Sequence, residues 1–293
     1  MEFKKEKTAF LKYLEHNLSR SQKTLETYDL YLTRFFNWLA KNKISSLTKI
    51  NKQTIQKYKA WLRTITFGNN KKFSAKTFNY HLIALRMLFV YLRRSDKKVF
   101  APEQIELINQ PKARPIFLTN KELANLLEVS INKTANSINK QPIQLRDKAL
   151  LEFLFATGLK ISEIIKLKKA DLKHFKLGQQ ANFWLNKYLE KRTDKSPFLF
   201  ISYDRASSSR TKAQPTAAAL TPRSLQRIVH KCSMLAGLMK KVTPQIIRNT
   251  FGLRLLKNGA TIKEVRAAMN FESDLAARSY IEALKKSLKS IIL

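Results

Sequence analysis

The sequence predicts a mainly α-helical protein of two domains with a reduced β-sheet. Apolar residues recur every three or four positions along most of the chain, which is the period of one face of an α-helix. The 293 residues include 6 Gly and 8 Pro, too few for a protein built from many strands and turns. The length also fits two domains, at about 100 to 200 residues each.

Four helices are predicted in the first domain, residues 1–100. Long apolar stripes mark helices over 24–39 and 74–92, and shorter patterns mark helices near 10–18 and 54–62. The residues of the two long stripes are Leu25, Tyr28, Leu32, Phe35 and Leu39, then Phe78, Leu82, Leu85, Phe89 and Leu92. Each stripe needs a partner to cover it, so these helices are expected to pack together as a small all-α domain.

Three prolines interrupt the pattern after the first domain. Pro102, Pro111 and Pro115 are spaced so that no long helix can cross them. We therefore expect a linker over 101–116 and a second domain over 117–293.

The second domain begins with a helix-start signal. Thr119 and Glu122 have the spacing of a capping box, in which each side chain bonds to the backbone of the other residue. A further apolar helix is predicted over 145–156, ending at Gly158 as a C-cap.

Strand signals are weak in this domain. Residues 174–177 and 198–202 are the two short candidates, and 181–192 has a helical pattern. The last apolar stripe is Ile281, Leu284, Leu288 and Ile291. It predicts a C-terminal helix that covers either its own domain or a neighbouring protomer.

Composition narrows the class of function. The chain carries 56 Lys+Arg against 21 Asp+Glu, a formal net charge of +35, so a polyanion such as nucleic acid is the expected partner. With 44% hydrophobic and 10% aromatic residues the chain can fold, which excludes a disordered basic tail. A biased composition with a generic basic surface predicts the same charge.

Other features point to a cytoplasmic protein. No apolar stretch is long enough to span a membrane, and the charged N-terminus does not resemble a signal peptide. Cys232 is the single cysteine, so no intramolecular disulfide can form. With four scattered histidines it forms no pattern of zinc ligands, and no metal or other cofactor is expected.

Three motifs in the second domain carry the strongest functional signal. Thr-Pro-Gln-Ile-Ile-Arg-Asn-Thr-Phe occupies 243–251, Thr-Gly-Leu-Lys-Ile-Ser-Glu occupies 157–163, and Tyr280 follows Phe271 by nine residues. The set resembles the tyrosine recombinase (phage integrase) family, in the layout of its Xer branch. There the motifs read Thr-Pro-His-x-x-Arg-His-Thr-Phe, Thr-Gly-Leu-Arg-x-Ser-Glu, and Leu-Gly-His with a Tyr nine residues after the His. Several ordered motifs at matching spacing make a chance similarity improbable.

The resemblance spans nearly the whole chain and implies both a fold and a chemistry. The predicted helices at 24–39 and 74–92 are similar to the family's N-terminal core-binding (SAM-like) helices, and the second domain corresponds to the catalytic domain. In this family a Tyr hydroxyl attacks a DNA phosphodiester without a metal, which forms a 3′-phosphotyrosyl link and releases a 5′-hydroxyl. Two arginines clamp the phosphoryl oxygens through forked hydrogen bonds, a lysine acts as general acid, and two histidine-type positions assist.

The resemblance assigns five residues to these catalytic positions. Tyr280 is the implied nucleophile and Arg248 the second clamp arginine. Lys160 stands at the first clamp position, where it keeps the charge but lacks the fork. Gln245 and Phe271 replace the two histidines; the former can hydrogen-bond but not exchange a proton near neutral pH, and the latter can only pack. Structural roles remain open for Tyr280, as a buried or interface residue, and for Arg248, as a packing residue of its helix.

The general acid cannot be assigned from the sequence. In the family it lies on a β-hairpin after the Ser-Glu helix, and in this chain that hairpin is short or absent. Lys187, Lys191 and Lys195 are nearby candidates, and nothing in the sequence selects one of them.

The favoured hypothesis is a catalytically impaired recombinase homologue that clamps duplex DNA between its two domains. Lys71, Lys72, Lys76 and Arg86 are the DNA contacts that the resemblance suggests. An active, divergent recombinase and a non-specific basic architectural protein are the alternatives. The family also implies an oligomer on DNA, with another copy or another recombinase, formed through the C-terminal segment.

Overall fold

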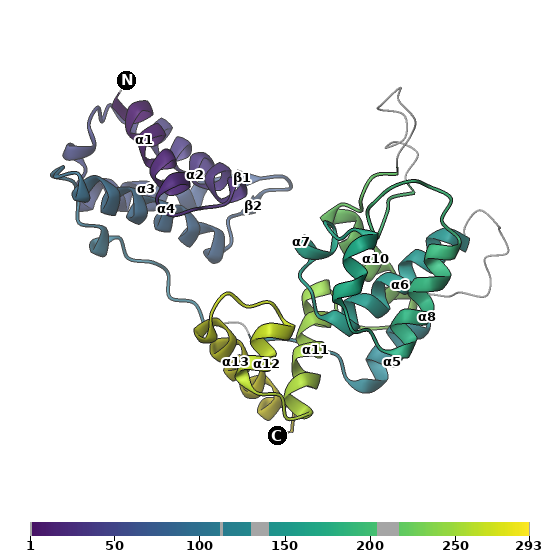
Figure 1. The fold of residues 1–293 in the computed structure, drawn as a ribbon. Coiled ribbons are helices and arrows are strands. Elements are labelled where there is room, and N and C mark those ends of the chain that lie inside the picture. The colour runs from purple at the N-terminus through teal and green to yellow at the C-terminus, as the bar shows by residue number, and fades with distance from the viewer. Residues whose placement is uncertain (1, 112–113, 130–140, 204–216, 293) are drawn as a thin grey trace. The chain divides into compact units, whose positions relative to one another are not determined.

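The computed structural model describes residues 2–111, 114–129, 141–203 and 217–292. They form two compact units, Met1–Lys112 and Ala113–Leu293. Helices dominate both units, and strand is confined to very short pieces (Figure 1). The mainly α fold class predicted from the apolar periodicity is confirmed. No helix among the described residues is long and apolar enough to cross a membrane.

The first unit contains four α-helices, as predicted. They are α1 (Glu2–His16), α2 (Gln22–Lys41), α3 (Lys52–Thr64) and α4 (Ala75–Arg94), with a short 3-10 turn η1 (Leu47–Lys49) before α3. Three of the helices begin at a polar cap: Ser21, Asn51 and Ser74 each accept a hydrogen bond from a backbone N–H in the first turn. The apolar stripes of α2 and α4 face one shared core, which includes the fully buried Leu32, Phe35, Leu85 and Phe89.

A two-stranded hairpin connects α3 to α4, and the sequence patterns did not predict it. Strands β1 (Thr66–Phe67) and β2 (Lys71–Lys72) pair antiparallel around a Gly-Asn-Asn turn. Asn69 and Asn70 both have positive φ, which asparagine tolerates better than most residues. The strands are two residues long and both are exposed, so no alternation of apolar residues marks them.

Part of the predicted linker packs against the first unit. Pro102–Gln104 forms a 3-10 turn, η2, and Ile105 is fully buried in the core of the first unit. Arg86 on α4 donates from Nε to the Ile105 carbonyl at 2.7 Å, and Asn79 exchanges two hydrogen bonds with the backbone of Ile108. These contacts hold residues 105–108 against α4.

The second unit is also built from helices. In chain order they are α5 (Asn120–Glu128), α6 (Gln141–Thr157), α7 (Ile161–Ile164), the 3-10 helix η4 (Lys169–His174), α8 (Gln179–Glu190), α10 (Pro222–Leu235), α11 (Pro244–Lys257), α12 (Ile262–Ala268) and α13 (Asp274–Ile292). The capping box of Thr119 and Glu122 is confirmed at the start of α5. Gly158, with φ +60°, follows the end of α6 as predicted.

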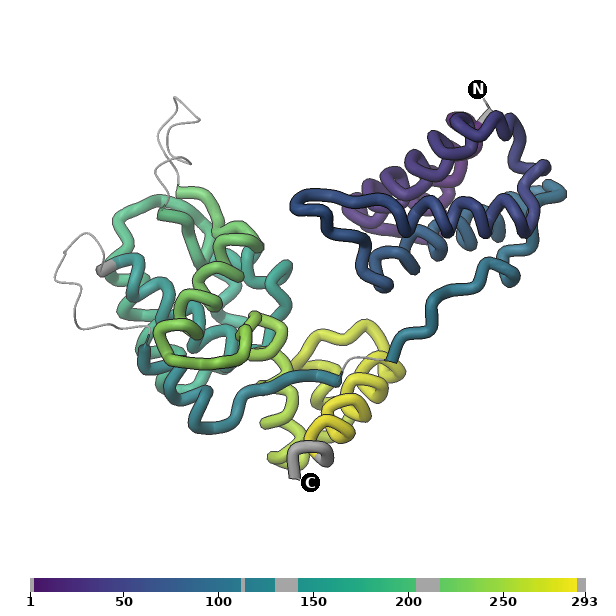
Figure 2. Tube along the Cα trace, turned by 180° about the vertical axis from the view of Figure 1, so that it is seen from behind, coloured from purple at the N-terminus to yellow at the C-terminus, as the bar shows by residue number. Residues whose placement is uncertain are grey.

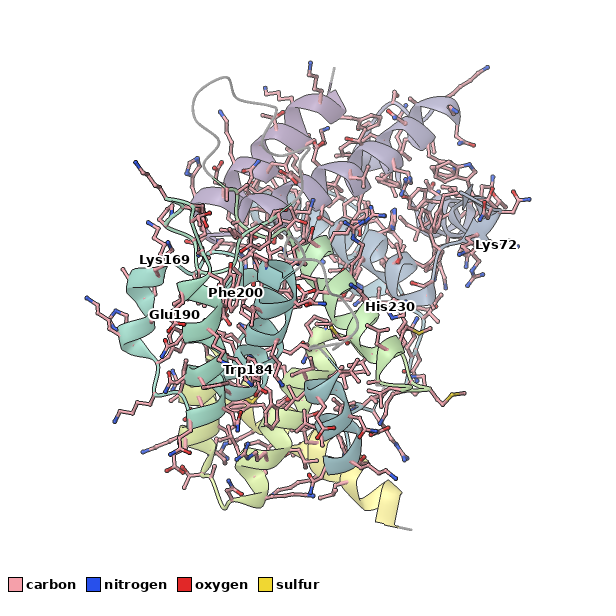
Figure 3. The ribbon with its side chains drawn as sticks, turned by 90° about the vertical axis from the view of Figure 1, so that its right-hand side faces the viewer. Lys72, Lys169, Trp184, Glu190, Phe200 and His230 are labelled. Atoms are coloured by element: carbon pink, nitrogen blue, oxygen red, sulfur yellow. The ribbon has the colours of Figure 1, made fainter. Side chains whose placement is uncertain are left out.

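Two groups of helices divide the second unit. α6 and α8 pack against each other around a core with Phe153 and Phe200, both essentially buried, and the latter is labelled in Figure 3. α11, α12 and α13 lie side by side in the views of Figures 1 and 2, with Val265, Met269 and Ile281 buried among them. α11 contacts both groups, so its side chains are enclosed on several sides.

The strand predictions in this unit were wrong. His174 ends η4, and the residue after it bonds back to Leu172, so 174–177 forms no strand. Residues 198–202 form only single bridges, Lys168 with Phe198 and Ile201 with Ala219. Between α7 and α8, a stretch described in full, there is no β-hairpin.

Candidate functional site

α11 carries two of the five assigned residues, Gln245 and Arg248, and its start is fixed by local chemistry. Thr243 is the N-cap and accepts a hydrogen bond from the Ile246 N–H, while Pro244 occupies the first helical position, where a missing N–H does no harm. The five residues after Gln245 are all buried: Ile246, Ile247, Arg248, Asn249 and Thr250. An arginine and an asparagine are therefore held inside the unit.

Arg248 is 4% exposed, and its guanidinium is held by backbone carbonyls. It donates to the carbonyls of Gly158 and Met269, and it lies 5.4 Å from the ring centroid of Phe271. In the described part of the chain no carboxylate forms an ion pair with it. Burial lowers the pKa of the Arg248 side chain. Electrostatic interactions with Tyr280 and Glu163 raise this pKa and offset part of the shift. The side chain has five N–H donors and uses two on carbonyls, so it can still bind an anion.

The carbonyl of Gly158 reaches Arg248 because the backbone turns sharply there. The residue has φ +60°, and a Cβ at this position would lie 2.2 Å from Cδ1 of Phe251. Only glycine combines this conformation with such a close approach. The Gly158 position is thus part of how Arg248 is held.

A cavity of about 310 Å³ lies beside Arg248. Its lining residues are Leu159, Lys160, Ile161, Ser162, Pro222, Pro244, Gln245 and Arg248. The long helices α10 and α11 both start at this cavity, and the start of a helix carries a partial positive charge. With two cationic side chains and an amide in its wall, the cavity can hold a phosphate group.

Lys160 lies at the edge of the cavity with its side chain 43% exposed. Its Nζ donates to the Asn270 carbonyl at 3.3 Å and lies 3.9 Å from a carboxylate oxygen of Glu163. Asn270 in turn donates from its side-chain amide to the same carboxylate at 2.8 Å. Lys160 is therefore tied loosely at the rim and keeps donors for a ligand.

Tyr280 projects from α13 toward α11. Its hydroxyl donates to Oδ1 of Asn249 at 3.1 Å, and its ring lies 5.1 Å from that of Phe271. Gly252 makes room for it, since a Cβ there would lie 2.9 Å from the Tyr280 hydroxyl oxygen. Burial raises the pKa of the Tyr280 phenol well above its usual range, and the Arg248 charge lowers it in part.

Gln245 and Tyr280 meet at the same acceptor. The side-chain N–H of the exposed Gln245 donates to Oδ1 of Asn249 at 2.9 Å, and Nδ2 of Asn249 donates to the Ile116 carbonyl at 2.9 Å. Asn249 was not singled out from the sequence. The signal was present, because the residue after the motif arginine is Asn where the family pattern reads His.

The five residues assigned by resemblance form two neighbouring groups. Lys160, Gln245 and Arg248 line the cavity, whereas the rings of Tyr280 and Phe271 contact each other at a tilted angle of 47° and are not among its lining residues. Arg248 joins the two groups through its contact with Phe271.

The three lysines considered as general acid do not line the cavity. Lys187, Lys191 and Lys195 are all exposed. The Nζ of Lys187 lies 4.5 Å from the ring centroid of Phe183 and 5.6 Å from that of Trp184, the α8 residue labelled in Figure 3.

The basic residues assigned to DNA contact in the first unit differ in their surroundings. Lys71 and Lys72 on β2 and Lys76 on α4 are exposed, and Lys72 lies at the edge of the unit (Figure 3). Lys76 lies over the ring of Tyr80, 5.9 Å from its centroid. Arg86 is half-buried and is committed to the Ile105 carbonyl.

Comparison with known families covers both units. Residues 8–96 match the phage integrase N-terminal SAM-like domain, and residues 173–287 match the phage integrase family. The chain belongs to the tyrosine recombinase family. The chain is 25% identical to the tyrosine recombinase XerD of Listeria innocua, over 96% of this chain and 95% of that protein. It is 28% identical to XerD of Yersinia pestis, over 95% and 92% of the two chains.

Solved recombinase structures share the fold. The XerH recombinase in a post-cleavage complex with palindromic difH substrate superposes with a TM-score of 0.66 at 21% identity, covering 98% of this chain and 84% of that one. The Tn1549 transposon integrase in complex with circular intermediate DNA superposes with a TM-score of 0.64 at 16% identity, covering 94% of each chain. The recombinase fold therefore extends over both units.

Proposed function

We propose that this tyrosine recombinase homologue binds duplex DNA, with a backbone phosphate in the cavity beside Arg248, and that its strand-cleavage step is impaired. The observation that carries the proposal is Arg248 itself. It is a buried cation with no carboxylate partner in the described chain, at the wall of a cavity that Lys160 and Gln245 share. A phosphate would supply the missing negative charge. The net charge of +35 and the DNA-bound states of similar recombinase structures support the same partner.

The impairment is proposed from the groups available for transition-state stabilisation. Lys160 cannot form the forked pair of an arginine, Gln245 cannot exchange a proton, and Phe271 donates nothing. Loss of one such donor typically reduces the rate by about 10² to 10³-fold. Because these effects are non-additive, three altered positions reduce the rate by less than the product, but the loss stays large.

A covalent trapping assay tests the proposal. The purified protein is incubated with nicked suicide DNA carrying its candidate site, beside Tyr280→Phe, and the products are separated on native and denaturing gels. We expect a shifted band on the native gel for both proteins and no Tyr280-dependent covalent adduct. Absence of the shift would overturn DNA binding, and an adduct that disappears in Tyr280→Phe would overturn the impairment.

An active, divergent recombinase is the second candidate function. The observation that favours it is that Tyr280 hydrogen-bonds the residue adjacent to Arg248, so a nucleophile and a clamp arginine lie together. In the trapping assay, this function predicts a covalent adduct that depends on Tyr280. The triple variant Lys160→Arg, Gln245→His, Phe271→His restores the family residues at these three positions and is a matched comparison. We expect it to raise the adduct yield if the native residues impair cleavage.

A non-specific architectural role predicts a different binding preference. In that case the protein would bind an inverted-repeat site and random duplex equally well. Salt sensitivity does not separate the two roles, because every protein that neutralises phosphates shows it. A competition experiment between the inverted-repeat duplex and the random duplex, at one salt concentration, does separate the two roles.

Assembly on DNA is proposed as well. The similar structures include a lambda integrase tetramer on a Holliday junction, which supports an oligomer with a second copy or with another recombinase. On α13, Ile281, Leu284 and Leu288 pack within their own unit, so any intersubunit contact would use other residues. A chromosomal or mobile-element substrate would place the protein in the cytoplasm.

A further inference from the structure

Asn249 joins three parts of the second unit through one side chain. It is 6% exposed on α11. Its Oδ1 accepts hydrogen bonds from the Tyr280 hydroxyl at 3.1 Å and from Gln245 at 2.9 Å. Its Nδ2 donates to the Ile116 carbonyl at 2.9 Å. Both lone pairs of the amide oxygen are therefore in use.

The chemistry of the partners fixes which way this amide points. The Ile116 carbonyl can only accept, so an N–H must face it. Turning the carboxamide over would set Oδ1 against that carbonyl and Nδ2 against the N–H of Gln245, which removes two hydrogen bonds. With Oδ1 facing α13, the Tyr280 hydroxyl must be the donor. Its proton then points at an amide oxygen, which cannot take it up near neutral pH.

Ile116 begins a short segment, residues 116–118, that is fastened to two helices. The Leu118 N–H donates to Oγ1 of Thr250 on α11 at 2.9 Å. Phe117 is buried against Leu253 of α11 and Leu284 of α13, and Tyr280 packs at the same cluster. This segment follows closely after the first unit ends at Lys112.

We propose that Asn249 is a positioning residue that holds the Tyr280 hydroxyl and links its position to segment 116–118. Displacement of the Ile116 carbonyl removes the acceptor that orients the carboxamide. Asn249 can then turn, and the Tyr280 hydroxyl loses its shorter hydrogen bond and keeps only the Arg248 carbonyl, at 3.5 Å. The role rests on the proposed function of Tyr280 as nucleophile, although the hydrogen bonds themselves do not depend on DNA.

Chemical modification of Tyr280 tests the hold without DNA. Tetranitromethane nitrates accessible phenolates, and mass spectrometry reports each tyrosine separately. Tyr80, 44% exposed on the first unit, is the reference in the same sample. We expect Asn249→Ala to raise the nitration rate of Tyr280 about fivefold, the effect of removing one hydrogen bond, and to leave Tyr80 unchanged. An unchanged Tyr280 rate would overturn the positioning role.

Asn249→Asp is the second variant, nearly identical in shape and suited to the case in which the alanine variant does not fold. It keeps an acceptor for Tyr280 and adds a negative charge that disfavours the phenolate, so Tyr280 should nitrate more slowly than in the wild type. It also lacks the N–H for Ile116. We therefore expect faster amide hydrogen exchange in a peptide covering 114–118. Wild-type exchange in that peptide would overturn the link to the segment.

Thr250→Val is the matched control on the next residue of α11. It removes the acceptor of the Leu118 N–H and leaves Asn249 in contact with Ile116 and Tyr280. Exchange of the Leu118 amide should rise, whereas nitration of Tyr280 should stay at the wild-type rate because the hydrogen bond from Asn249 to the Ile116 carbonyl is kept. A rise in Tyr280 nitration equal to that of Asn249→Ala would mean that general loosening, and not Asn249, sets its position.

The two proposals fail separately. Absence of DNA binding would overturn the proposed function and leave the nitration and exchange results as they are. Normal DNA binding together with wild-type nitration in Asn249→Ala would overturn only the role of Asn249.

Discussion

The guanidinium of Arg248 on α11 donates to the carbonyl of Gly158, 90 residues earlier in the chain. This hydrogen bond joins two motifs of the second domain that are distant in sequence. It requires the turn at Gly158, where φ is +60° and the ring of Phe251 leaves no space for a Cβ. The position of a buried cation therefore depends on a residue with no side chain.

Gly158→Ala should destabilise the protein and displace this carbonyl. The added Cβ would lie 2.2 Å from Phe251 Cδ1, and overpacking of this kind typically costs about 1–3 kcal/mol. Urea unfolding measures the loss. Gly178→Ala is the control, since nothing lies within 4 Å of its Cβ and its φ is negative. Equal stability of the two variants would contradict the close packing at Gly158.

Arg248→Lys should weaken DNA binding although the charge is kept. Lysine lacks the fork that can hold the Gly158 carbonyl and a phosphate together. Since a hydrogen bond to a charged group contributes about 1.5–3 kcal/mol, we expect affinity to fall about tenfold or more. Arg254→Lys makes the same change on the exposed side of α11 and should bind nearly as the wild type. A gel-shift titration at fixed salt compares them, and equal affinities would contradict a phosphate at Arg248.

Lys71→Ala, Lys72→Ala and Lys76→Ala should each weaken DNA binding, similarly for every sequence. These side chains are exposed and can reach a phosphate without disturbing the fold. The slope of log affinity against log salt should become shallower by about one for each phosphate that the variant no longer neutralises. Lys98→Ala, another exposed lysine of the first unit, is the control. Wild-type slopes in all three variants would contradict DNA binding by the hairpin and the first turn of α4.

Arg86→Ala should behave differently from the lysine variants. Its Nε holds the Ile105 carbonyl, so the variant should also lose stability, by about 1.5–3 kcal/mol for a hydrogen bond from a charged donor. Urea unfolding separates this effect from the change in affinity. Unchanged stability would show that the hydrogen bond to Ile105 contributes little.

The sequence predicted the helices because their signal is repeated along many residues. The apolar stripes from Leu25 to Leu39 and from Phe78 to Leu92 predict which face of each helix is buried. In the structure these faces pack in the core of the first unit. The hairpin at Thr66 to Lys72 was not predicted because both strands are short and exposed. Such strands show no alternation of apolar and polar residues. Residues 198–202 have the composition of a strand but find only single-residue bridges.

The candidate site was accessible from the sequence only where residue type implies chemistry. Arg248 and Tyr280 were found by motif, since a guanidinium and a phenol have recognisable roles. Asn249 and Gly158 act through a carboxamide and a carbonyl whose partners are distant in sequence, Ile116 and Arg248. Such hydrogen bonds follow from the packing of α11 against its neighbours, which no local pattern contains.

The stability of the first unit should depend on pH through His81. This side chain is 1% exposed; Nδ1 donates to the Thr77 carbonyl at 2.9 Å, and Nε2 accepts from Arg34. Burial lowers the pKa of His81 to about 4; the Thr77 hydrogen bond raises it and the Arg34 charge lowers it.

The sign follows because the folded-state pKa of His81 lies below the unfolded value of 6.5. The favourable contribution of the neutral ring is complete above pH 6.5 and is lost as the pH falls toward 4, by up to about 3 kcal/mol. Urea unfolding at a series of pH values measures it. His81→Phe keeps a ring beside Tyr31 and Phe73, and it should flatten the profile between pH 6.5 and 4 relative to the wild type. His16→Phe, at an exposed position, should keep the wild-type profile. If both variants keep the wild-type dependence of stability on pH, the neutral His81 side chain does not contribute to the stability of this unit.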